Sequence, residues 1–469
     1  MVTKSHDRRI IINIRMFLSQ QISNFIYNTN YGNLPDDVIE KAKQCLFDSI
    51  GVALYGSQFE ASQISLALIK KMGGENEASI LGTNQKTPCF LAALANGIRG
   101  HIADYDDSLA DFGGHPSCIL MPVTLALAEM RGIGGQEILT AFILGSEVGS
   151  KLGRVMGKNH YDTGFHPTGT IGTIAAVAAA AKLLELLPSQ ITNALGIAAS
   201  SASGLRQNFG TMTKSWHAGH AASMGVMAAL LAQKGFNASV KVLEGETGFI
   251  QTFQGSRELF PLGQLGNPYS LMKIQVKVYP SCAMTHPSVD AILKLKKEYC
   301  FNSQEVKAME CYICSRASSI LGHKKPHNAL QAKFSLEYCL VAALISGNLG
   351  INQFTDEAVS KSEVRGIMKK ISIKIDPHMD ELAKKKNLLS PSKIKIILNN
   401  EQEVSQTVGE AKGGPNNPLK WSELEEKFLE CSHKLLSKNQ VKKFCHRIRN
   451  LEEISNISDL VSLLISKNT

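Results

Sequence analysis

The sequence lacks the glycine signatures of three large groups of enzymes. Its 469 residues contain no Gly-x-Ser-x-Gly elbow, no phosphate-binding P-loop and no Gly-x-Gly-x-x-Gly dinucleotide fingerprint. These absences count against a serine hydrolase, a nucleoside triphosphatase and a dinucleotide-dependent enzyme. No internal repeat and no low-complexity tract points to a structural array instead.

A disulfide framework is also missing. The ten cysteines are scattered along the chain and lie mostly among apolar residues, which is typical of reduced thiols in a cytosolic protein. Cys311 and Cys314 form one Cys-x-x-Cys pair, but no second pair follows at the spacing of a zinc site. The cysteine pattern therefore favours buried thiols over a metal centre.

No apolar run is long and uncharged enough to be read as a membrane span. The longest, residues 170–187, is rich in alanine and contains Lys182 and Glu185, which favours a buried helix. Residues 8–21 begin like a signal peptide, but polar residues interrupt the apolar core and no cleavage site of small residues follows. The sequence predicts a cytoplasmic protein with no membrane partner.

Positive charge exceeds negative charge, but it is spread thinly. The net charge is +9, from 50 Lys and Arg against 41 Asp and Glu. Short lysine runs of this kind are usually solvated helix ends or loops. No DNA-binding motif and no basic stripe interleaved with aromatic residues accompanies them. We expect no nucleic-acid partner, and a small anionic substrate suits the charge balance.

Apolar residues recur at three- and four-residue spacing through the first part of the chain, which predicts helices. The clearest of these helices cover residues 36–56, 89–105, 118–132 and 135–157. Residues 168–232 are rich in Ala, Gly and Ser, whose small side chains let helix backbones approach closely. We predict a tightly packed all-helical domain over residues 1–268.

The pattern changes after about residue 270, where polar and apolar residues alternate as they do in half-buried strands. The predicted strands lie in residues 272–280, 306–315, 367–377 and 393–400. Helical stretches separate them, and a Gly/Pro/Asn-rich linker precedes a return to helix. The fold class predicted is therefore mainly α: a large helical domain, an inserted α+β domain over residues 269–405, and C-terminal helices over residues 406–469 that rejoin the first part.

Polar residues gather in four segments at the expected ends of helices or strands. The first, residues 101–117 (HIADYDDSLADFGGHPS), holds four carboxylates and two histidines, and within it Asp107 and Asp111 are expected to face water or cap a helix. The others are residues 160–170, 206–222 and 277–288.

Each of these segments allows a functional and a structural interpretation. His166 stands beside a predicted helix N-terminus, where free backbone N–H groups favour anions, or in a simple surface turn. Lys214 is either a ligand for a substrate carboxylate or a solvated lysine. His217 and His220 are three residues apart, as in a metal pair, but no acidic third ligand lies nearby in the sequence. Cys282 is either a reactive thiolate or a small packed residue.

In their order along the chain these segments resemble the MmgE/PrpD family. The resemblance rests on HIADYDDS and HPS, GFHPTGTIGTIAAVAAAAKLL, FGTMTKSWHAGHAA, LEGETGF, KVYPSCAMTHPS, AKFSLEYCLVAAL and GGPNNP with SELEEKF, which together span about residues 30–430. It implies a homodimer, each subunit having a large helical domain and a smaller α+β lid domain. It also implies an active site in the cleft between the two domains that uses no cofactor and no metal.

The resemblance carries over residue by residue to one pocket. The implied catalytic residues are Asp104, His115, His166, Lys214 and Lys277. The implied substrate-binding residues are Ser108, Arg206, Tyr279 and Cys282. In this scheme the lysines, with Arg206, neutralise substrate carboxylates, one of the histidines moves a proton, and Asp104 orients a neighbour or acts as the base.

The family implies a cofactor-independent lyase acting on a small di- or tricarboxylate, with cis-aconitate decarboxylation as the expected reaction. Iminodisuccinate epimerisation and 2-methylcitrate dehydration remain open, because the same residues could serve all three. Cys282 stands where the decarboxylase branch has a histidine, which motivates a further alternative: a dimer that binds carboxylates without turnover. A metal-dependent hydratase is disfavoured because no three ligands have suitable spacing in the sequence.

Overall fold

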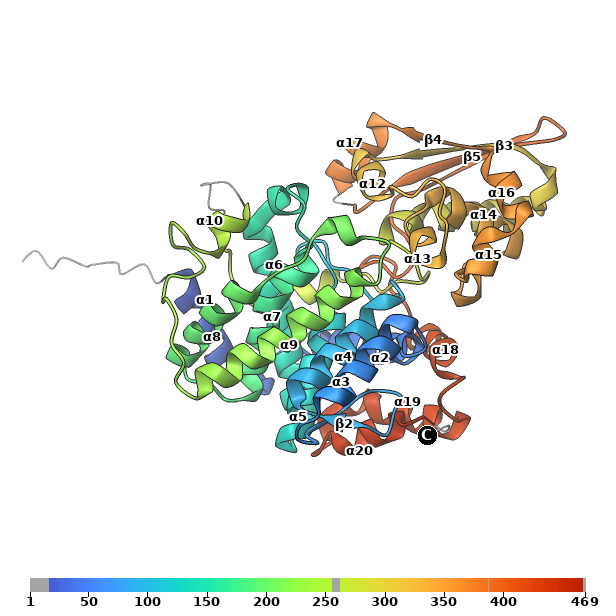
Figure 1. The fold of residues 1–469 in the computed structure, drawn as a ribbon. Coiled ribbons are helices and arrows are strands. Elements are labelled where there is room, and N and C mark those ends of the chain that lie inside the picture. Colours follow the sequence, from blue (N-terminus) through green and yellow to red (C-terminus); the bar gives the residue numbers. More distant parts are fainter. Residues whose placement is uncertain (1–16, 255–261, 387, 467–469) are drawn as a thin grey trace, which may run out of the picture.

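The computed structural model describes residues 17–254, 262–386 and 388–466. Two hydrophobic cores divide these residues (Figure 1). One core runs from Ile22 to Val276 and resumes from Leu419 to Leu464, and the other runs from Tyr279 to Val404. We call residues 279–408 the lid and the remainder the helical part. The prediction of a mainly α fold is confirmed. The segment that resembles a signal peptide lies largely outside the described residues.

The helical part is built around long helices whose bounds follow the apolar spacing. They are α1 (Leu18–Asn28), α2 (Asp36–Gly56), α3 (Glu60–Met72), α4 (Cys89–Ile102), α5 (Ser117–Arg131), α6 (Gly135–Asp162), α7 (Pro167–Leu183), α8 (Pro188–Ser201), α9 (Thr213–Gln233) and α10 (Phe249–Gln254), with the short pair β1 (Ala78–Ser79) and β2 (Lys86–Thr87). Helix α6 contains a break at Gly157, where the backbone leaves helical geometry at φ +61°. With ψ at −164° this is a conformation open mainly to glycine, which has no Cβ atom.

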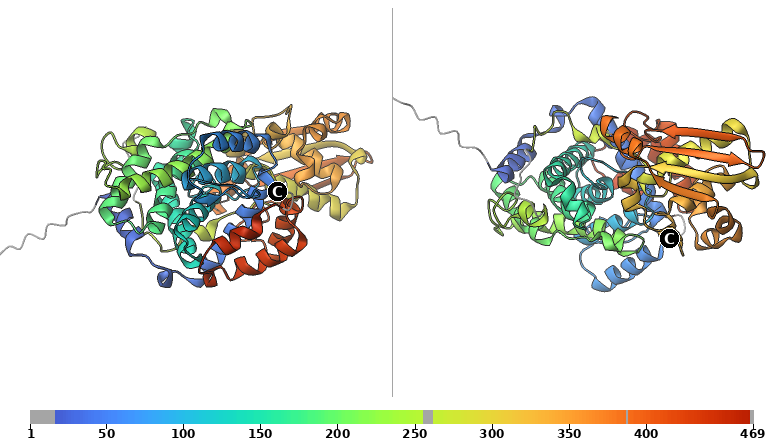
Figure 2. Two further views of the ribbon diagram at one scale, coloured as in Figure 1. Left: turned by 60° about the horizontal axis from the view of Figure 1, so that its bottom comes forward. Right: turned by 90° about the horizontal axis from the view of Figure 1, so that it is seen from above.

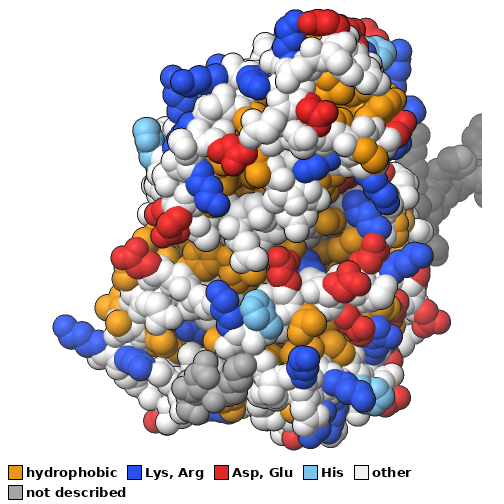
Figure 3. Space-filling view, turned by 90° about the vertical axis from the view of Figure 1, so that its right-hand side faces the viewer, with side chains coloured by type: hydrophobic (Ala, Val, Ile, Leu, Met, Phe, Trp, Pro, Cys, Tyr) orange, Lys and Arg blue, Asp and Glu red, His pale blue; other side chains and the backbone are white. Residues whose placement is uncertain are grey.

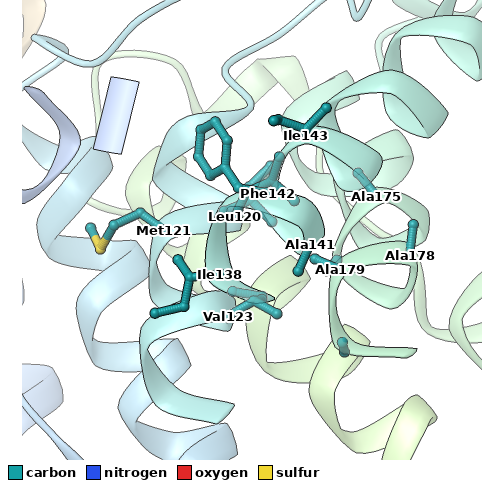
Figure 4. Close-up of a cluster of buried hydrophobic side chains, with 14 of the residues drawn as sticks. Leu120, Met121, Val123, Ile138, Ala141, Phe142, Ile143, Ala175, Ala178 and Ala179 are labelled. Carbon is teal, nitrogen blue, oxygen red and sulfur yellow. The ribbon is translucent and has the colours of Figure 1, made fainter. Parts of the chain in front are cut away.

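The alanine-rich helix α7 lies in the centre of this part. Its residues from Ala175 to Ala181 are buried, and the helix packs against α5 and α6 (Figure 4). The prediction of a buried helix here is confirmed. Within the described residues no helix is both long and apolar enough to cross a bilayer.

Glycine allows α4 and α9 to touch backbone to backbone. A Cβ atom added at Gly97 of α4 would lie 2.6 Å from the Cα atom of Gly219 on α9. One turn after Gly97, α4 carries His101, and the first turn of α9 carries Lys214. The distance between these two helices therefore sets the distance between two polar side chains of the pocket described below.

We expect Gly97→Ala to destabilise the protein by about 3 kcal/mol, because the added methyl group must push the two backbones apart. Chemical denaturation monitored by circular dichroism measures the change. Gly32→Ala is the matched control, since a Cβ atom at Gly32 meets nothing within 4 Å. Equal stability of the two variants would contradict the close approach of α4 and α9.

The lid is a four-stranded sheet with helices packed against it. Its elements are α11 (His286–Tyr299), β3 (Val306–Ile313), α12 (Ser315–Ile320), α13 (Ala329–Ala332), α14 (Leu336–Ser346), α15 (Asp356–Ser360), α16 (Ser362–Met368), β4 (Ile371–Ile375), α17 (Pro377–Lys386), β5 (Ser392–Leu398) and β6 (Glu403–Val408). The strand order is β4-β3-β5-β6, with β3 and β4 parallel and the other pairs antiparallel. Alternate residues of β5 are buried, as predicted from the alternation, and α11 packs against this strand.

One predicted strand is wrong, and one strand of the lid was missed, as were the short strands β1 and β2. Residues 270–273 form a 3₁₀ turn. In the extended segment after it, Gln275 forms an isolated bridge with Ser108, and the N–H of Val276 donates to the carbonyl oxygen of Gly413 at 2.9 Å. Its alternation has another cause: Ile274 and Val276 enter the helical core, whereas Lys277 lies beside the pocket. Strand β6 is short and polar, so its apolar alternation was too weak to predict it.

The chain returns from the lid to the helical part through α18 (Trp421–Ser432), α19 (Lys438–Arg449) and α20 (Ser458–Val461). The ring of Phe428 stacks on that of Phe47 of α2 at 4.6 Å, so the last helices lie beside the first ones (Figure 2). Seen from the side on which the lid lies, hydrophobic side chains gather in a hollow that crosses the middle of the surface (Figure 3).

Candidate active site

A pocket opens where the two parts meet, and the ends of three helices reach it. His166 caps the start of α7, Lys214 is in the first turn of α9, and the loop after α4 supplies further side chains. The cavity has a volume of about 80 Å³. The predicted residues that line it are Asp104, Ser108, His115, His166, Lys214 and Cys282. Other side chains in the lining are Tyr161, Phe209, Met284, Arg316 and Phe334.

Asp104 joins two buried lysines. Its Oδ1 accepts hydrogen bonds from Nζ of Lys277 at 2.6 Å and from Nζ of Lys214 at 3.2 Å. Burial alone would raise the pKa of Asp104, but the two ammonium groups hold it well below its usual value. The backbone of Asp104 adopts φ +50°, a left-handed conformation that costs free energy in a non-glycine residue. The carboxylate is therefore ionised at neutral pH and held by a strained turn.

Lys277 is placed by the extended segment that links the helical part to the lid. The backbone N–H groups of Ser108 and Gln275 each donate to the other residue's carbonyl oxygen at 2.8 Å. This pairing brings Lys277, two residues further on, under Asp104, where its Nζ also donates to the Asp104 carbonyl oxygen at 3.1 Å. Lys277 is fully buried and lies behind Asp104 rather than in the lining of the pocket.

His115 presents one free ring nitrogen to the pocket. Its Nδ1 lies 2.6 Å from the carbonyl oxygen of Asp107, so Nδ1 carries the proton and Nε2 keeps its lone pair. Burial lowers the pKa of His115 to about 3, so the ring is neutral at physiological pH. The Asp107 carboxylate accepts from the backbone N–H of Ser117 at 3.3 Å and so caps α5, one of the two roles expected for it.

His101 and Asp106 form a pair that the sequence analysis missed. Asp106 Oδ2 lies 2.7 Å from Nδ1 of His101, and Nε2 of the same ring accepts a hydrogen bond from Nζ of Lys214 at 3.0 Å. Lys214 is therefore held between the imidazole of His101 and the carboxylate of Asp104. Both residues stand in the polar segment 101–117, and the three-residue spacing from His101 to Asp104 was the available signal.

Three imidazoles converge beside Lys214. Ring nitrogens of His101, His115 and His166 all lie within 4.8 Å of one another. The spacing argument against a metal triad was therefore wrong, because α4, the following loop and the start of α7 supply one histidine each. His217 and His220 do not belong to a converging group within the described ranges. His217 bonds to Nδ1 of His166 at 3.0 Å, and His220 bonds to the carbonyl oxygen of Ser201 at 3.0 Å.

Comparison with known proteins assigns the architecture. The MmgE/PrpD N-terminal domain matches residues 20–260, and the MmgE/PrpD C-terminal domain matches residues 279–453. The chain belongs to the MmgE/PrpD family. It is 25% identical to the cis-aconitate decarboxylase of Aspergillus terreus over 96% of each chain, and 27% identical to that of Homo sapiens over 95% and 94%. It is 25% identical to the 2-methylcitrate dehydratase of Salmonella typhimurium over 78% and 80%.

These relatives remove CO₂ or water from their substrates, as their names state, and the MmgE/PrpD chain described here is a lyase. Asp104, His115, His166 and Lys214 line its interdomain pocket, and Lys277 lies behind Asp104.

Cys282 of this MmgE/PrpD protein is a partly exposed residue at the start of the lid. Burial raises the pKa of its thiol to about 11, and the neighbouring carboxylate of Asp104 acts in the same direction. The thiol therefore stays protonated at neutral pH, which favours the interpretation as a packed residue over that as a nucleophile.

We expect Cys282→Ala to keep turnover within about threefold of wild type, because a protonated thiol is a poor nucleophile. Steady-state assays of the two proteins measure the change, and Cys300→Ala, at an exposed position outside the pocket, serves as the control. A hundredfold loss confined to Cys282→Ala would restore a catalytic role for the thiol.

Arg206 and Tyr279 do not line the pocket, although both were predicted to bind substrate. The guanidinium of Arg206 lies 3.8 Å from the ring centroid of Tyr161 and donates to the Tyr161 carbonyl oxygen at 2.9 Å. Tyr161 does line the pocket, so Arg206 acts on the site by holding this ring. The hydroxyl of Tyr279 donates to Asp290 at 2.5 Å inside the lid.

Lys333 of the lid reaches across to the helical part and was missed by the sequence analysis. It is 1% exposed, and its Nζ donates to the carbonyl oxygen of Ala103 at 2.7 Å and to that of Pro280 at 2.9 Å. Burial lowers the pKa of Lys333 to about 7. Because Ala103 directly precedes Asp104, this side chain supports the strained turn of the pocket. Nothing in the spacing of the sequence points to this contact.

Proposed function

We propose that the protein is a cofactor-independent decarboxylase of cis-aconitate or a closely similar tricarboxylate. The observation that carries the proposal is the placing of His115 and Lys214 together in one pocket, with His115 neutral and Lys214 bonded to Asp104. The decarboxylase relatives support it, since they align over nearly the whole chain, whereas the dehydratases align over about three quarters of it.

The reaction needs a proton donor and a place for negative charge. The C–C bond to a terminal carboxylate breaks, and its electron pair forms a new C=C bond to the central carbon. The electron pair of the former C=C bond takes a proton at the vinylic carbon, which releases CO₂ and itaconate. Charge moves onto a remaining carboxylate during this step, and a fixed ammonium group beside that carboxylate lowers the barrier.

The residues of the pocket divide these tasks. Lys214, held by Asp104 and His101, binds the carboxylate that gains charge. His115 is kept neutral by burial and takes up a proton when the anionic substrate binds, because nearby negative charge raises the pKa of an imidazole. It then gives this proton from Nε2 to the vinylic carbon. His166, also kept neutral by burial, hydrogen-bonds a carboxylate oxygen.

Proton NMR in deuterated buffer tests the proposal, with purified protein and cis-aconitate, 2-methylcitrate or iminodisuccinate. We expect itaconate carrying one deuterium from cis-aconitate. Water loss from 2-methylcitrate, or deuterium exchange in iminodisuccinate without loss of CO₂, would replace it with dehydratase or epimerase activity. Thermal stabilisation by these acids without any product would indicate the carboxylate-binding dimer.

The converging imidazoles favour one second candidate, a metal-dependent hydratase. The nitrogens of His101, His115 and His166 have the ligand types of a catalytic zinc site, and Asp106 would orient His101 from the second coordination shell. Activity measured after dialysis against a chelator separates the two candidates. Full turnover by metal-depleted protein supports the decarboxylase, and recovery only on adding Zn²⁺ supports the hydratase.

We propose, as a separate point, that the protein is a homodimer. Leu205, Met212 and Trp216 expose 54%, 36% and 42% of their surface around the start of α9. Neighbouring apolar side chains of this kind often mark an interface. Light scattering should give twice the 51.0 kDa of the chain, and Trp216→Ser should shift the mass towards the monomer.

The compartment is also a proposal. The ten cysteines are free and seven of them are buried, which suits a reducing cytoplasm. A fluorescent fusion expressed in cells tests it, and accumulation of the fusion in an organelle would contradict it.

A further inference from the structure

The charges inside the pocket cancel one another. Asp104 is paired with Lys214 and Lys277, and Asp106 lies 3.8 Å from Nζ of Lys277. Two carboxylates thus face two ammonium groups. The histidines add no charge, because burial lowers their pKa values. A substrate with three carboxylates therefore needs a further cation that no protein carboxylate already neutralises.

Arg316 of the lid is such a cation. It lines the pocket and is exposed. Its guanidinium makes no ion pair and no hydrogen bond with any of the described residues. Its backbone is fixed on α12: the neighbouring Ser315 donates from its N–H and its hydroxyl to Asp380 at 2.9 and 2.6 Å, and Ala317 is buried. The backbone of Arg316 is therefore held in place, while its guanidinium is free to bind a ligand.

Arg316 also lines a second hollow that adjoins the pocket at its outer side. The two cavities share Ala110, Gly113, Tyr161 and Arg316. Two basic side chains besides histidine line the pocket in the described part of the chain: Lys214, which is paired with Asp104, and Arg316, which has no carboxylate partner.

The hollow itself carries a modest excess of positive charge. Arg154 and Lys158 of α6 are exposed in its wall, together with Asp162. The other carboxylate in the wall, Asp111, is neutralised by Lys273 at 2.9 Å. This charge attracts anions over a distance but does not fix them, because exposed charges are screened by salt.

We propose that Arg316 binds a non-reacting carboxylate of the substrate and so selects tricarboxylates over acids that lack this group. The inference rests on the proposed function, since it names the residue that recognises the third carboxylate at the same site. A guanidinium binds a carboxylate through two parallel hydrogen bonds, which gives both affinity and orientation. Arg316 is on the lid whereas Lys214 is on the helical part, so the two ends of the substrate are held by different domains.

Calorimetric titration with two unreactive probes tests this role. Tricarballylate has three carboxylates and no double bond, and methylsuccinate is the same molecule without one terminal carboxylate. Wild type should bind tricarballylate about 10- to 100-fold more tightly than methylsuccinate, the range expected for a charged hydrogen-bonded pair. In Arg316→Met this ratio should fall to near one with methylsuccinate unaffected, and Arg316→Lys should keep only part of it.

Turnover of cis-aconitate by the same proteins separates this inference from the proposed function. Arg316→Met should raise KM about 10- to 100-fold with kcat within a few fold, whereas Arg154→Met, on the outer hollow alone, should change KM about twofold. An unchanged probe ratio in Arg316→Met would overturn the role of Arg316 even if turnover persists. If the probe selectivity depends on Arg316 but cis-aconitate is not turned over, the decarboxylase proposal is overturned and the role of Arg316 is supported. If the wild type binds neither probe, both proposals are overturned.

Discussion

Replacing Asp104 with asparagine is expected to abolish turnover and to destabilise the protein by about 3–5 kcal/mol. The substitution leaves Lys277, fully buried, and Lys214, nearly so, without the carboxylate that pairs them, and an uncompensated buried charge has a cost of this size. Turnover should fall about a thousandfold or more, because Lys214 loses one of the two groups that hold it. Denaturant titration and a steady-state assay measure the two effects.

A double variant separates charge balance from catalysis. The double variant Asp104→Asn/Lys277→Met removes one buried ammonium group together with the carboxylate. It should therefore regain much of the stability that Asp104→Asn alone loses. Turnover should not return, because Lys214 still lacks Asp104. If the double variant were no more stable than Asp104→Asn, the two lysines would not be paired through this carboxylate. Recovery of turnover would exclude Asp104 from the site.

The second large effect concerns His115 and has a defined dependence on pH. Burial lowers its pKa to about 3, so the protonated form becomes tenfold scarcer for each pH unit above that value. The proposed step needs this proton, and kcat/KM reports the free enzyme and free substrate. Between pH 7 and 9, where substrate carboxyls are ionised, kcat/KM should therefore fall about tenfold per pH unit. The value of kcat should fall less, because bound carboxylates raise the pKa of His115.

His115→Gln should lower kcat by about 10²- to 10⁴-fold and remove this slope. His446→Gln, at an exposed position of α19, is the matched control. A level kcat/KM in the wild type, together with an active His115→Gln, would transfer the donor role to the ammonium group of Lys214.

Much of the helical architecture could be read from the sequence because apolar spacing is a local property. Residues 36–56 were predicted as a helix and form α2, and Gly157 marks the predicted end of a helix. The wrong prediction at residues 272–280 also has a physical reason. Alternating polar and apolar residues show that successive side chains lie in different environments, but they do not show that the backbone is hydrogen-bonded to a neighbouring strand. The segment runs between the helical core and the pocket, so it alternates without belonging to a sheet.

The site was predicted in part, and the missed residues share a cause. Asp104, His115, His166 and Lys214 stand in polar segments at helix ends, where a sequence pattern is visible, and the structure places all four in one pocket. The meeting of His101 with His115 and His166 depends on the turn at Asp104 and on the packing of α7, which no spacing records. Arg316 was missed because it stands at a strand–helix junction with no other charged residue or histidine within five positions, and only the docking of the lid brings it to the pocket.

Lys333 limits how far the lid can be treated as a module. The lid is continuous in sequence, yet its buried ammonium group is bonded to a carbonyl oxygen next to Asp104 in the other part. A lid exchanged with that of another protein must carry a lysine at this position, or the Ala103 carbonyl is left buried without its donor. The two cores should consequently unfold in one cooperative thermal transition. If the lid begins to separate from the helical part, the turn at Asp104 should be disturbed before either core unfolds.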